Sequence, residues 1–466
     1  MKRRWLATLG LVMALALVAT ACGDDDAGTT TTAAETTTTA GGEETTTTAG
    51  ETTTTAAALA YDTGVTPAPC SDAVNEGNGC IYLGVISDLT DGPFAPLAVP
   101  LTQAQEDFWT TINAGGGLDG FDVIISPENT FDAHYRGEDT VQGYLGMRDR
   151  VLAMAQVLGT PQTQAALPDI AADETVVMPA TWWSGWAFSD VDGGLILESG
   201  ASYCIEGMNG MSYVADTMGT EISWALVAFP GDYGGDYAAG AKIAAAALGF
   251  ADPLEILQIP QSAGGDYTET IPVLLAAQPD LIVFVTGPTE MATVIGGLAQ
   301  AGYMTFKAMG AGPTWNVALT QSPVFPVLEA VFFQTVPWGG WGYDSDGHAA
   351  LRAAAEASGQ SPNGGYIAGW TWQYPMLAVL QQAIADNDLT RANLAAIARS
   401  LEGVDYAGML PDRSYTGSAN DNIERNTIIN VPDAESPDGS SAVTEFFVSE
   451  VAAEYDMSAP CYAPSS

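Results

Sequence analysis

The sequence is 466 residues long and carries 13 Lys and Arg against 56 Asp and Glu, for a formal net charge of −43 at pH 7. This length exceeds one ordinary core, so two lobes are expected, and so acidic a surface excludes nucleic acid as a favourable partner. The chain has two histidines, His134 and His348, and no Cys or His spacing typical of a zinc site, so neither a metal nor a cofactor is predicted.

The first residues are expected to form a targeting signal. Basic residues 2–4 precede an apolar run, 5–18, which is too short for a good membrane span. Small residues then lead into Cys22, an arrangement that resembles a bacterial lipoprotein signal: residues 1–21 would be removed and Cys22 lipidated, anchoring the protein to the outer face of the cell membrane. Ala19 stands where leucine is more usual, so a soluble secreted product remains an alternative, as does an uncleaved helical anchor.

The next segment, 22–69, is expected to be a disordered linker. It consists of near-repeats of Thr, Ala, Glu and Gly, such as "TTTTAAETTTTAGGEETTTT", with almost nothing to bury. A coil of this length reaches roughly 35–40 Å, which would hold a folded body just off a membrane.

Four cysteines remain besides Cys22: Cys70, Cys80, Cys204 and Cys461. An even number outside the cytoplasm predicts two disulfides, for which three pairings exist. The short, turn-rich interval between the first two favours Cys70–Cys80, which leaves Cys204–Cys461. Buried free thiols are the alternative.

The body of the chain alternates between buried strands and helices. In the first half we predict strands at 80–89, 121–128, 151–159 and 175–180, and helices at 101–113, 138–150 and 162–173. In the second half we predict strands at 221–230, 254–260 and 280–287, and helices at 234–248, 267–277 and 289–301, followed by consecutive helices over 344–403. This alternation predicts an α/β fold with parallel sheets, which bind ligands at the carboxyl ends of their strands.

Motifs that suggest an enzyme stand in the wrong context. "GGGLDG" (115–120) matches a dinucleotide pattern, but it follows a helix and precedes a strand, so a glycine helix cap and tight turn fit better. "DSDG" (344–347) lacks the acidic ligands that would continue a calcium loop. No Walker loop, nucleophile elbow or His-Glu-x-x-His motif is present, which argues against an enzyme without excluding one.

Four stretches together resemble type I periplasmic substrate-binding proteins, the branched-chain amino-acid-binding group of ABC importers. They are "YLGVISDLTDGPFAPLA" (82–98), "TINAGGGLDGFDVIIS" (111–126), "VLGTPQTQAALPDIAADETVVMPATWWS" (157–184) and "AFPGDYGGDYAAGAK" (228–242). The resemblance covers roughly 80–420. It implies two Rossmann-like lobes joined by a three-crossing hinge, with lobe one at 80–198 plus 333–403 and lobe two at 199–332 plus 404–466.

The resemblance also assigns site residues. Thr163, at a helix start, would receive the ligand carboxylate, and Ser184 would supply a second hydroxyl. Tyr233 would close over the ligand as an aromatic wall, Glu290 would pair with the ligand ammonium, and Phe94 would cover the ligand side chain. Thr163 and Ser184 could instead be cap or turn residues, Tyr233 could pack on its own helix, and Glu290 could serve only the helix dipole.

The run "TWWSGW" departs from the small residues usual after the fourth strand. One or two tryptophans of this run and of "VPWGGWGYD" (336–344) are expected to line the cleft, with Trp182 and Trp183 as the candidates, whereas others belong to the core. The resemblance therefore implies a binding protein that delivers a small ligand, an amino acid or related compound, to an ABC permease. A ligand-sensing ectodomain of the same fold and an extracellular α/β enzyme are the alternatives.

Overall fold

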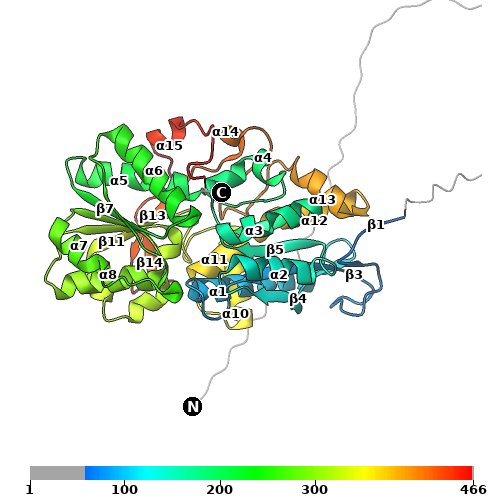
Figure 1. Cartoon of the computed structure of the whole chain (residues 1–466). Coiled ribbons are helices and arrows are strands. Elements are labelled where there is room, and N and C mark those ends of the chain that lie inside the picture. The colour runs from blue at the N-terminus through cyan, green and yellow to red at the C-terminus, as the bar shows by residue number, and fades with distance from the viewer. Residues whose placement is uncertain (1–57, 464–466) are drawn as a thin grey trace, which may run out of the picture. The chain divides into compact units, whose positions relative to one another are not determined.

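Buried aliphatic strands form two large sheets within residues 58–463, which are the residues that the computed structural model describes, and a third sheet has only two short strands (Figure 1). The predicted signal, Cys22 and most of the predicted linker lie outside the described residues. Each large sheet is covered by helices, and we call the large sheets with their helices the first lobe and the second lobe.

The first lobe contains a five-stranded sheet in the order β2-β3-β5-β6, with β4 paired to β3. Its strands are β2 (Val65–Thr66), β3 (Gly79–Ser87), β4 (Phe121–Asp132), β5 (Ala153–Leu158) and β6 (Val177–Ala180). Its helices are α1 (Ala95–Ala114), α2 (Gly137–Met147), α3 (Thr160–Ala172), α10 (Asp346–Ser358), α11 (Gly364–Thr371), α12 (Gln373–Ala385) and α13 (Arg391–Ala398). The strands from β3 to β6 are parallel, as predicted.

Two sequence-based boundaries need correction in this lobe. The linker was expected to run to residue 69, but β1 (Ala60–Tyr61) pairs with β12 (Asp388–Leu389), and β2 pairs antiparallel with β3. Val65 is buried there, so a few apolar side chains and backbone ladders suffice to fix this stretch on the lobe. Helix α1 also begins earlier than predicted, with Pro96 in its first turn, where the missing N–H needs no partner.

The second lobe contains a seven-stranded sheet in the order β14-β13-β11-β10-β9-β7-β8. Its strands are β7 (Trp224–Ala228), β8 (Leu254–Leu257), β9 (Leu281–Val285), β10 (Lys307–Gly310), β11 (Phe332–Val336), β13 (Ile428–Pro432) and β14 (Ser440–Ala442). Its helices are α5 (Tyr203–Met218), α6 (Asp232–Leu248), α7 (Thr270–Ala277), α8 (Pro288–Gln300), α9 (Phe325–Val331) and α15 (Glu450–Glu454). The five strands from β8 to β11 are parallel, and β13 and β14 add antiparallel pairs at one edge.

The expected return to the first lobe at residue 333 falls inside β11, which pairs with β10 and β13 in the second sheet. The chain therefore crosses back after Val336. Short elements lie in the loops and connections: α4 (Ser189–Asp192), α14 (Ala419–Asn422) and the 3-10 helices η1 (Ser184–Ala187), η2 (Gln261–Ala263), η3 (Gly312–Thr314) and η4 (Val317–Gln321).

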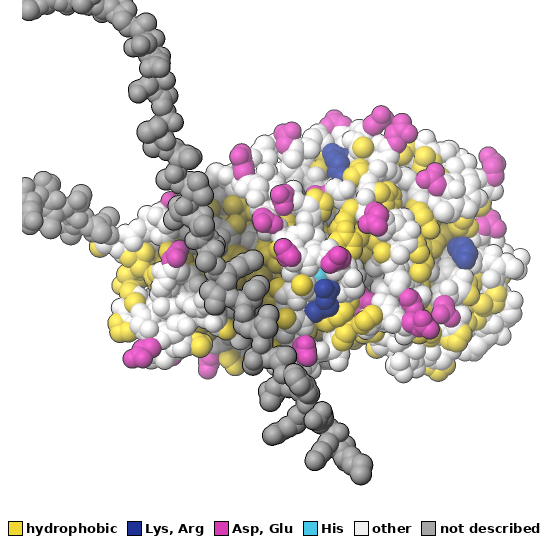
Figure 2. All heavy atoms as spheres, turned by 180° about the vertical axis from the view of Figure 1, so that it is seen from behind, with side chains coloured by type: hydrophobic (Ala, Val, Ile, Leu, Met, Phe, Trp, Pro, Cys, Tyr) yellow, Lys and Arg dark blue, Asp and Glu magenta, His cyan; other side chains and the backbone are white. Residues whose placement is uncertain are grey.

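Both predicted disulfides are confirmed. Cys70 is bonded to Cys80, beside β3, and Cys204 of α5 is bonded to Cys461 near the end of the described chain. Acidic side chains are scattered over the face seen in Figure 2, where Lys and Arg are few, as the net charge requires. Within residues 58–463 no helix has the length and apolar character to span a bilayer, and no cluster of His, Cys, Asp and Glu is arranged to hold a metal ion.

Candidate ligand-binding site

A small cavity lies between the two lobes. The first lobe contributes the start of α1, the loop after β4, the junction of β5 and α3, the end of β6 and the start of α12. The second lobe contributes α5, α6 and η3. The lining residues are Phe94, Leu97, Leu101, Tyr135, Leu158, Gly159, Thr160, Ala180, Trp182, Tyr203, Tyr233, Pro313 and Trp372.

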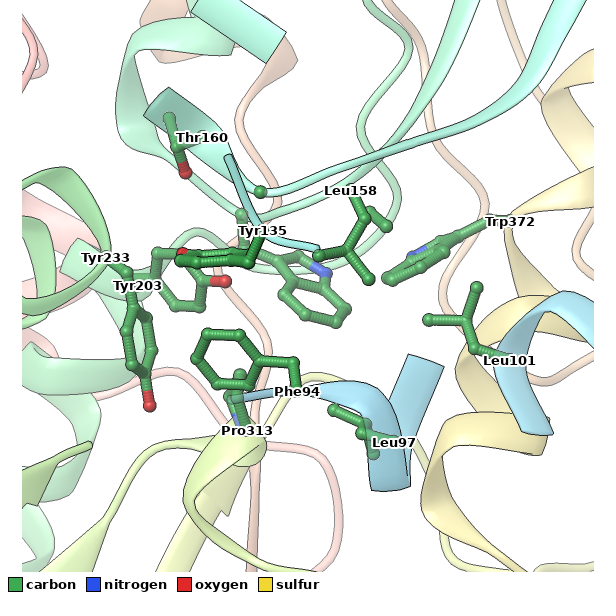
Figure 3. Close-up of a pocket in the computed structure, with 13 residues that line it drawn as sticks. Phe94, Leu97, Leu101, Tyr135, Leu158, Thr160, Tyr203, Tyr233, Pro313 and Trp372 are labelled. Carbon is green, nitrogen blue, oxygen red and sulfur yellow. The ribbon is translucent and has the colours of Figure 1, made fainter. Parts of the chain in front are cut away.

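The two ends of this cavity differ in chemistry (Figure 3). Hydroxyl-bearing side chains gather at one end, from Thr160, Tyr135, Tyr203 and Tyr233. The other end is made only of hydrocarbon and indole groups, from Leu97, Leu101, Leu158 and Trp372. Among the described residues, no Asp, Glu, Lys, Arg or His side chain lines the cavity.

Aromatic rings from both lobes meet across the cavity. The ring of Phe94 lies 4.9 Å from that of Tyr135 and 5.7 Å from that of Tyr233, both edge-on. The Tyr203 ring lies 4.9 Å from that of Tyr233. Such edge-to-face pairs are favourable beyond the apolar area that they bury. Phe94 comes from the first lobe and Tyr233 from the second. A ligand too large for the space between them would therefore require the two lobes to move apart.

Close helix packing places the two second-lobe tyrosines. Helices α5 and α6 approach at glycines: a Cβ on Gly240 would lie 1.9 Å from the carbonyl oxygen of Cys204, and one on Gly207 would lie 2.4 Å from that of Tyr237. Only glycine permits this approach, and it brings the starts of both helices to the cavity. Burial raises the pKa of the Tyr203 and Tyr233 hydroxyls well above the usual value, so both are neutral donors or acceptors.

Three of the residues expected from the sequence share the cavity: Phe94, Trp182 and Tyr233. Trp182 is 2% exposed, donates its indole N–H to the carbonyl oxygen of Ser199 at 2.7 Å, and packs 4.7 Å from the Trp372 ring. The Tyr233 hydroxyl lies 3.2 Å from the carbonyl oxygen of Thr286 and from the Thr314 hydroxyl.

Thr163 and Ser184 do not line the cavity. The Thr163 hydroxyl donates to the carbonyl oxygen of Gly159 at 2.8 Å, one turn back in its own chain, and Thr160 presents its side chain to the cavity instead. The Ser184 hydroxyl donates to the Asp236 carboxyl group at 2.5 Å and accepts from the Cys461 N–H at 2.9 Å. Both hydroxyls are thus engaged in holding backbone and neighbouring elements.

Glu290 and Trp183 also point elsewhere. Glu290, in the first turn of α8, accepts a hydrogen bond from the Gln261 N–H at 3.0 Å within the second lobe. Trp183 donates its indole N–H to the carbonyl oxygen of Tyr462 at 2.9 Å and packs on Trp186. The expected ammonium partner is therefore absent from the lining of this cavity in the described part of the chain.

Sequence reasoning missed several lining residues, notably Tyr135, Tyr203 and Trp372. Tyr203 belongs to α5, a helix that we did not predict although Ser202 caps its start by accepting from the Ile205 N–H at 3.4 Å. A serine before an apolar run is a helix-start signal, and it could have located α5. Trp372 lies far along the chain between α11 and α12, and no local pattern links it to this site.

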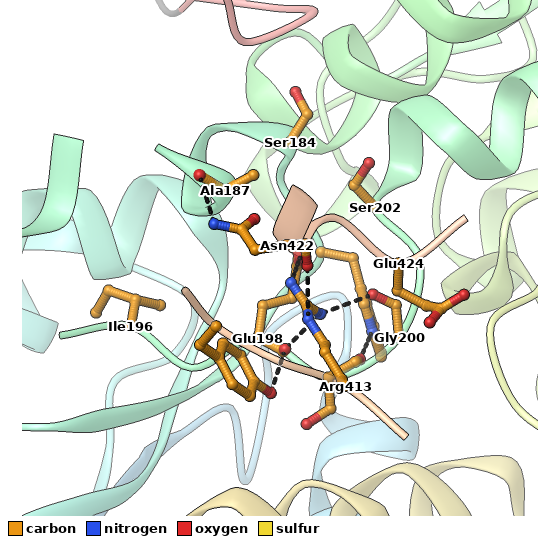
Figure 4. Close-up of polar contacts among 12 residues, drawn as sticks. Ser184, Ala187, Ile196, Glu198, Gly200, Ser202, Arg413, Asn422 and Glu424 are labelled. Carbon is orange, nitrogen blue, oxygen red and sulfur yellow. Dashed lines mark hydrogen bonds and ion pairs between the residues drawn. The ribbon is translucent and has the colours of Figure 1, made fainter. Parts of the chain in front are cut away.

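A charged network beside the cavity ties two of the chain crossings together (Figure 4). The buried Arg413 guanidinium donates to the carbonyl oxygens of Glu198 at 2.6 Å, Gly200 at 3.2 Å and Asn422 at 3.1 Å. Its Nη2 lies 3.8 Å from Oε2 of Glu198, and its guanidinium covers the Tyr415 ring at 4.7 Å. Burial raises the pKa of the Glu198 carboxyl well above its ordinary value, and Arg413 opposes that rise.

Comparisons with known proteins agree with this architecture. A family model described as "Periplasmic binding protein" matches residues 80–433. A solved fatty acid ABC transporter substrate-binding protein from Thermomonospora curvata is 25% identical, with a TM-score of 0.76 over 85% of this chain and 97% of its own. A search of curated protein sequences found no match.

Two other solved structures share the fold. A branched chain amino acid ABC transporter from Thermus thermophilus with bound valine is 16% identical, with a TM-score of 0.69 over 81% of this chain and 98% of its own. A solute binding protein of an ABC transporter from Rhodopseudomonas palustris, in complex with 3,4-dihydroxy benzoic acid, is 16% identical, with a TM-score of 0.65 over 79% and 96%. The predicted family and fold class are confirmed. Because the family model matches more than half of the chain, the protein belongs to the periplasmic binding protein family, the extracytoplasmic solute-binding proteins of ABC transporters, and is not an enzyme.

Proposed function

We propose that the ligand of this binding protein is a small amphipathic organic molecule with an apolar body, such as a fatty acid, and that the protein delivers it to an ABC import permease. The observation that carries the proposal is the lining of the cavity, which contains six aromatic rings and, among the described residues, no charged side chain.

The electrostatics of the cavity favour such a ligand over a zwitterion. A buried ammonium or carboxylate is stable only with paired charges or several hydrogen bonds. Glu290, expected from the sequence to hold an ammonium, instead bonds to the Gln261 N–H. In contrast, burying apolar surface of a ligand is favourable by about 25 cal/mol for each Å² removed from water. The end of the cavity that contains Leu97, Leu158 and Trp372 supplies the apolar surface for this contact.

The polarity gradient along the cavity suggests how the ligand lies. Its polar head would sit among Thr160, Tyr135 and Tyr203, and its apolar body would extend toward Leu101 and Trp372. The fatty acid-binding protein from Thermomonospora curvata, 25% identical to this chain, supports a ligand of this class. The amino acid inferred from the family resemblance stays a prediction and forms one arm of the test below.

Hinge closure would couple binding to delivery. Phe94 and Tyr233 come from different lobes and touch across the cavity, so a ligand between them stabilises the closed form by contacts with both. A permease that contacts both lobes would then distinguish the closed from the open form.

The test is isothermal titration of the delipidated protein with hexadecanoate, octanoate, 3,4-dihydroxybenzoate and leucine. We expect binding of at least one fatty acid and none of leucine, and we expect Glu290→Gln to leave that affinity unchanged. Binding of leucine alone, with strong weakening by Glu290→Gln, would refute the apolar ligand and establish the amino-acid prediction.

We also infer that Cys22 is lipidated and anchors the protein to the outer face of the cell membrane. Support comes from the basic residues 2–4, the short apolar run 5–18 and the small residues before Cys22. Expression in a bacterial host with an alkyne fatty acid should label the wild type and not Cys22→Ser. Equal absence of label, with release of both proteins into the medium, would indicate the secreted alternative.

A further inference from the structure

Two consecutive residues beside the cavity hold backbone conformations that side-chain-bearing residues rarely adopt. His134 has φ +50° and Tyr135 has φ +57°, both in the left-handed region. Strain of this kind persists only where the surroundings enforce it. Tyr135 lines the cavity, so whatever enforces this conformation also shapes the ligand site.

Asp132, the last residue of β4, makes hydrogen bonds to this loop and to the loop after β3. Its Oδ1 accepts hydrogen bonds from the His134 N–H at 3.1 Å and from the Leu89 N–H at 3.0 Å. Its Oδ2 accepts from the Thr90 hydroxyl at 2.6 Å. One carboxyl group thus joins the loop after β3 to the loop after β4.

An outer contact reinforces the same junction. His134 Nδ1 lies 2.7 Å from Oδ1 of Asp91 and 3.1 Å from the Thr90 hydroxyl. These groups are partly exposed, so the Asp132 contacts, which include two backbone donors, form the firmer part of the junction.

The loop after β3 carries Phe94 and has its own fixed shape. The buried Asp88 carboxyl accepts from the Gly92 N–H and the Phe94 N–H, both at 2.9 Å. A Cβ on Gly92 would lie 2.3 Å from the Asp88 carboxyl oxygens, so a side chain at this position would displace that carboxyl. Linking this loop to the one after β4 sets the Tyr135 and Phe94 rings 4.9 Å apart.

Helix α3 receives the positioned tyrosine. The Gln162 amide donates to the carbonyl oxygen of Tyr135 at 2.8 Å. A Cβ on Gly159 would lie 2.7 Å from the Tyr135 ring, so the ring passes directly over glycine. The Tyr135 ring is therefore placed by three segments, and Asp132 is the group that joins two of them.

We propose that Asp132 is a positioning residue for ligand binding: without lining the cavity, it holds His134 and Tyr135 in the left-handed conformation and so fixes the aromatic wall against which the ligand packs. This inference rests on the proposed function for the site and the ligand class. Asp132 would thus influence the affinity for the ligand although it does not line the cavity.

The test compares variants of the whole protein by titration with hexadecanoate. Asp132→Ala should weaken binding about tenfold or more, because the tyrosine loop can relax away from the wall. Asp132→Asn should keep most of the affinity, because its amide oxygen can still accept from the Leu89 and His134 N–H groups. In the Asp132→Ala background, His134→Gly should recover part of the loss, because glycine adopts positive φ without strain.

Asp122 provides the matched control at the opposite end of β4. Its carboxyl accepts from the Asn75 N–H, the Asn75 amide and the Asn78 amide, each at 2.8 Å, so Asp122→Ala removes a comparable set of bonds far along the strand. It should lower the unfolding temperature and leave affinity unchanged. Equal loss of affinity in Asp122→Ala, or wild-type affinity in Asp132→Ala, overturns the proposal.

The proposal can fail separately from the ligand class. If the wild type binds no fatty acid, the proposed ligand class is wrong, and crystal structures of the wild type and Asp132→Ala then decide about Asp132. Movement of residues 134–135 out of the left-handed region supports the positioning role, and an unchanged loop refutes it.

Discussion

The cavity and the crossing segments beside it bury different kinds of side chain. The cavity is walled by hydrocarbon, aromatic rings and neutral hydroxyls. The crossings hold a buried guanidinium, Arg413, against Glu198 and three carbonyl oxygens, and the buried carboxyl of Asp236 accepts from the Ser184 and Cys204 N–H groups. The two regions meet at Trp182, whose ring lines the cavity while its N–H bonds to Ser199 in a crossing.

The difference follows from what each region must do. Backbone groups in irregular crossings have no ladder partners, so buried polar side chains such as Arg413 and Asp236 satisfy them at fixed positions. A ligand cavity loses its water when a ligand binds. A charged side chain there would lose its hydration at each binding event, at a cost in free energy, unless the ligand paired with it. The crossing segments are therefore held by buried polar and charged groups, whereas the cavity is lined by apolar and neutral groups.

The largest loss of stability is expected from disrupting the charged network around Arg413. Arg413→Met removes the donor to the backbone carbonyls of Glu198, Gly200 and Asn422 and the ion-pair partner, at 3.8 Å, of the buried Glu198 carboxyl. It should lower the free energy of unfolding by about 3–5 kcal/mol in urea titrations. Arg399→Met is the control, since that half-exposed side chain pairs with Glu174 at 3.6 Å and should lose less than about 1 kcal/mol. Similar losses would show that the buried network contributes no more than a surface pair.

The two disulfides should contribute unequally to the stability of the protein. Cys204 and Cys461 are 257 residues apart in sequence, whereas Cys70 and Cys80 are 10 apart. Loop-closure entropy then predicts that removing the long-range bond, by alanine at both cysteines, destabilises the protein by about 2–3 kcal/mol more than removing the short-range one. Urea titrations of the two double variants check the order, and a larger loss for Cys70/Cys80 would contradict it.

A charged side chain placed in the apolar cavity should weaken ligand binding. Leu158→Asp puts a carboxyl at the apolar end and should weaken fatty acid binding about 10- to 100-fold, since its desolvation opposes closure. Leu158→Met preserves volume and should bind nearly as well as the wild type. Titration calorimetry, with circular dichroism to verify folding, measures both, and unchanged binding by Leu158→Asp would show that the cavity tolerates charge.

The pH dependence of stability should come from the crossing region. Burial raises the pKa of Asp236 to about 7 against hydrogen bonds from Ser184 that lower it, and burial likewise raises the pKa of Asp192 to about 7. Between the unfolded pKa near 4 and the folded value, the native state holds a proton that the unfolded state has lost. Stability should therefore fall as pH rises through this window, by at most about 1.4 kcal/mol per pH unit for each group.

Asp236→Asn should reduce that slope and leave the part due to Asp192. Thermal unfolding of both proteins at pH 4.5, 5.5 and 6.5 measures it. An identical slope in the two proteins would mean that Asp236 is ionised in the native state throughout.

Local patterns predicted most of the regular structure. Apolar runs predicted β3 to β9 and the main helices between them except α5, because burial on a parallel sheet imposes a continuous apolar stretch wherever the strand lies. Short cysteine spacing predicted Cys70–Cys80 and left Cys204–Cys461. The position of Phe94 and Tyr233 after strand ends brought them to the cavity as expected, since those ends meet between the lobes.

Tertiary structure decided which side chains face the cavity. Thr160 and Thr163 lie about one helical turn apart, and the Thr163 hydroxyl bonds to the backbone carbonyls of Gly159 and Val157, whereas Thr160 lines the cavity. Arg413 and Trp372 reach their places from distant segments, and Tyr135 owes its direction to a left-handed backbone held by Asp132. Local apolar patterns and cysteine spacing were enough to predict most strands and helices of the two lobes and both disulfides, and the resemblance of four motifs indicated the family. The direction of each functional side chain depends on donors and acceptors brought near by the fold, and these are set only when the whole chain is packed.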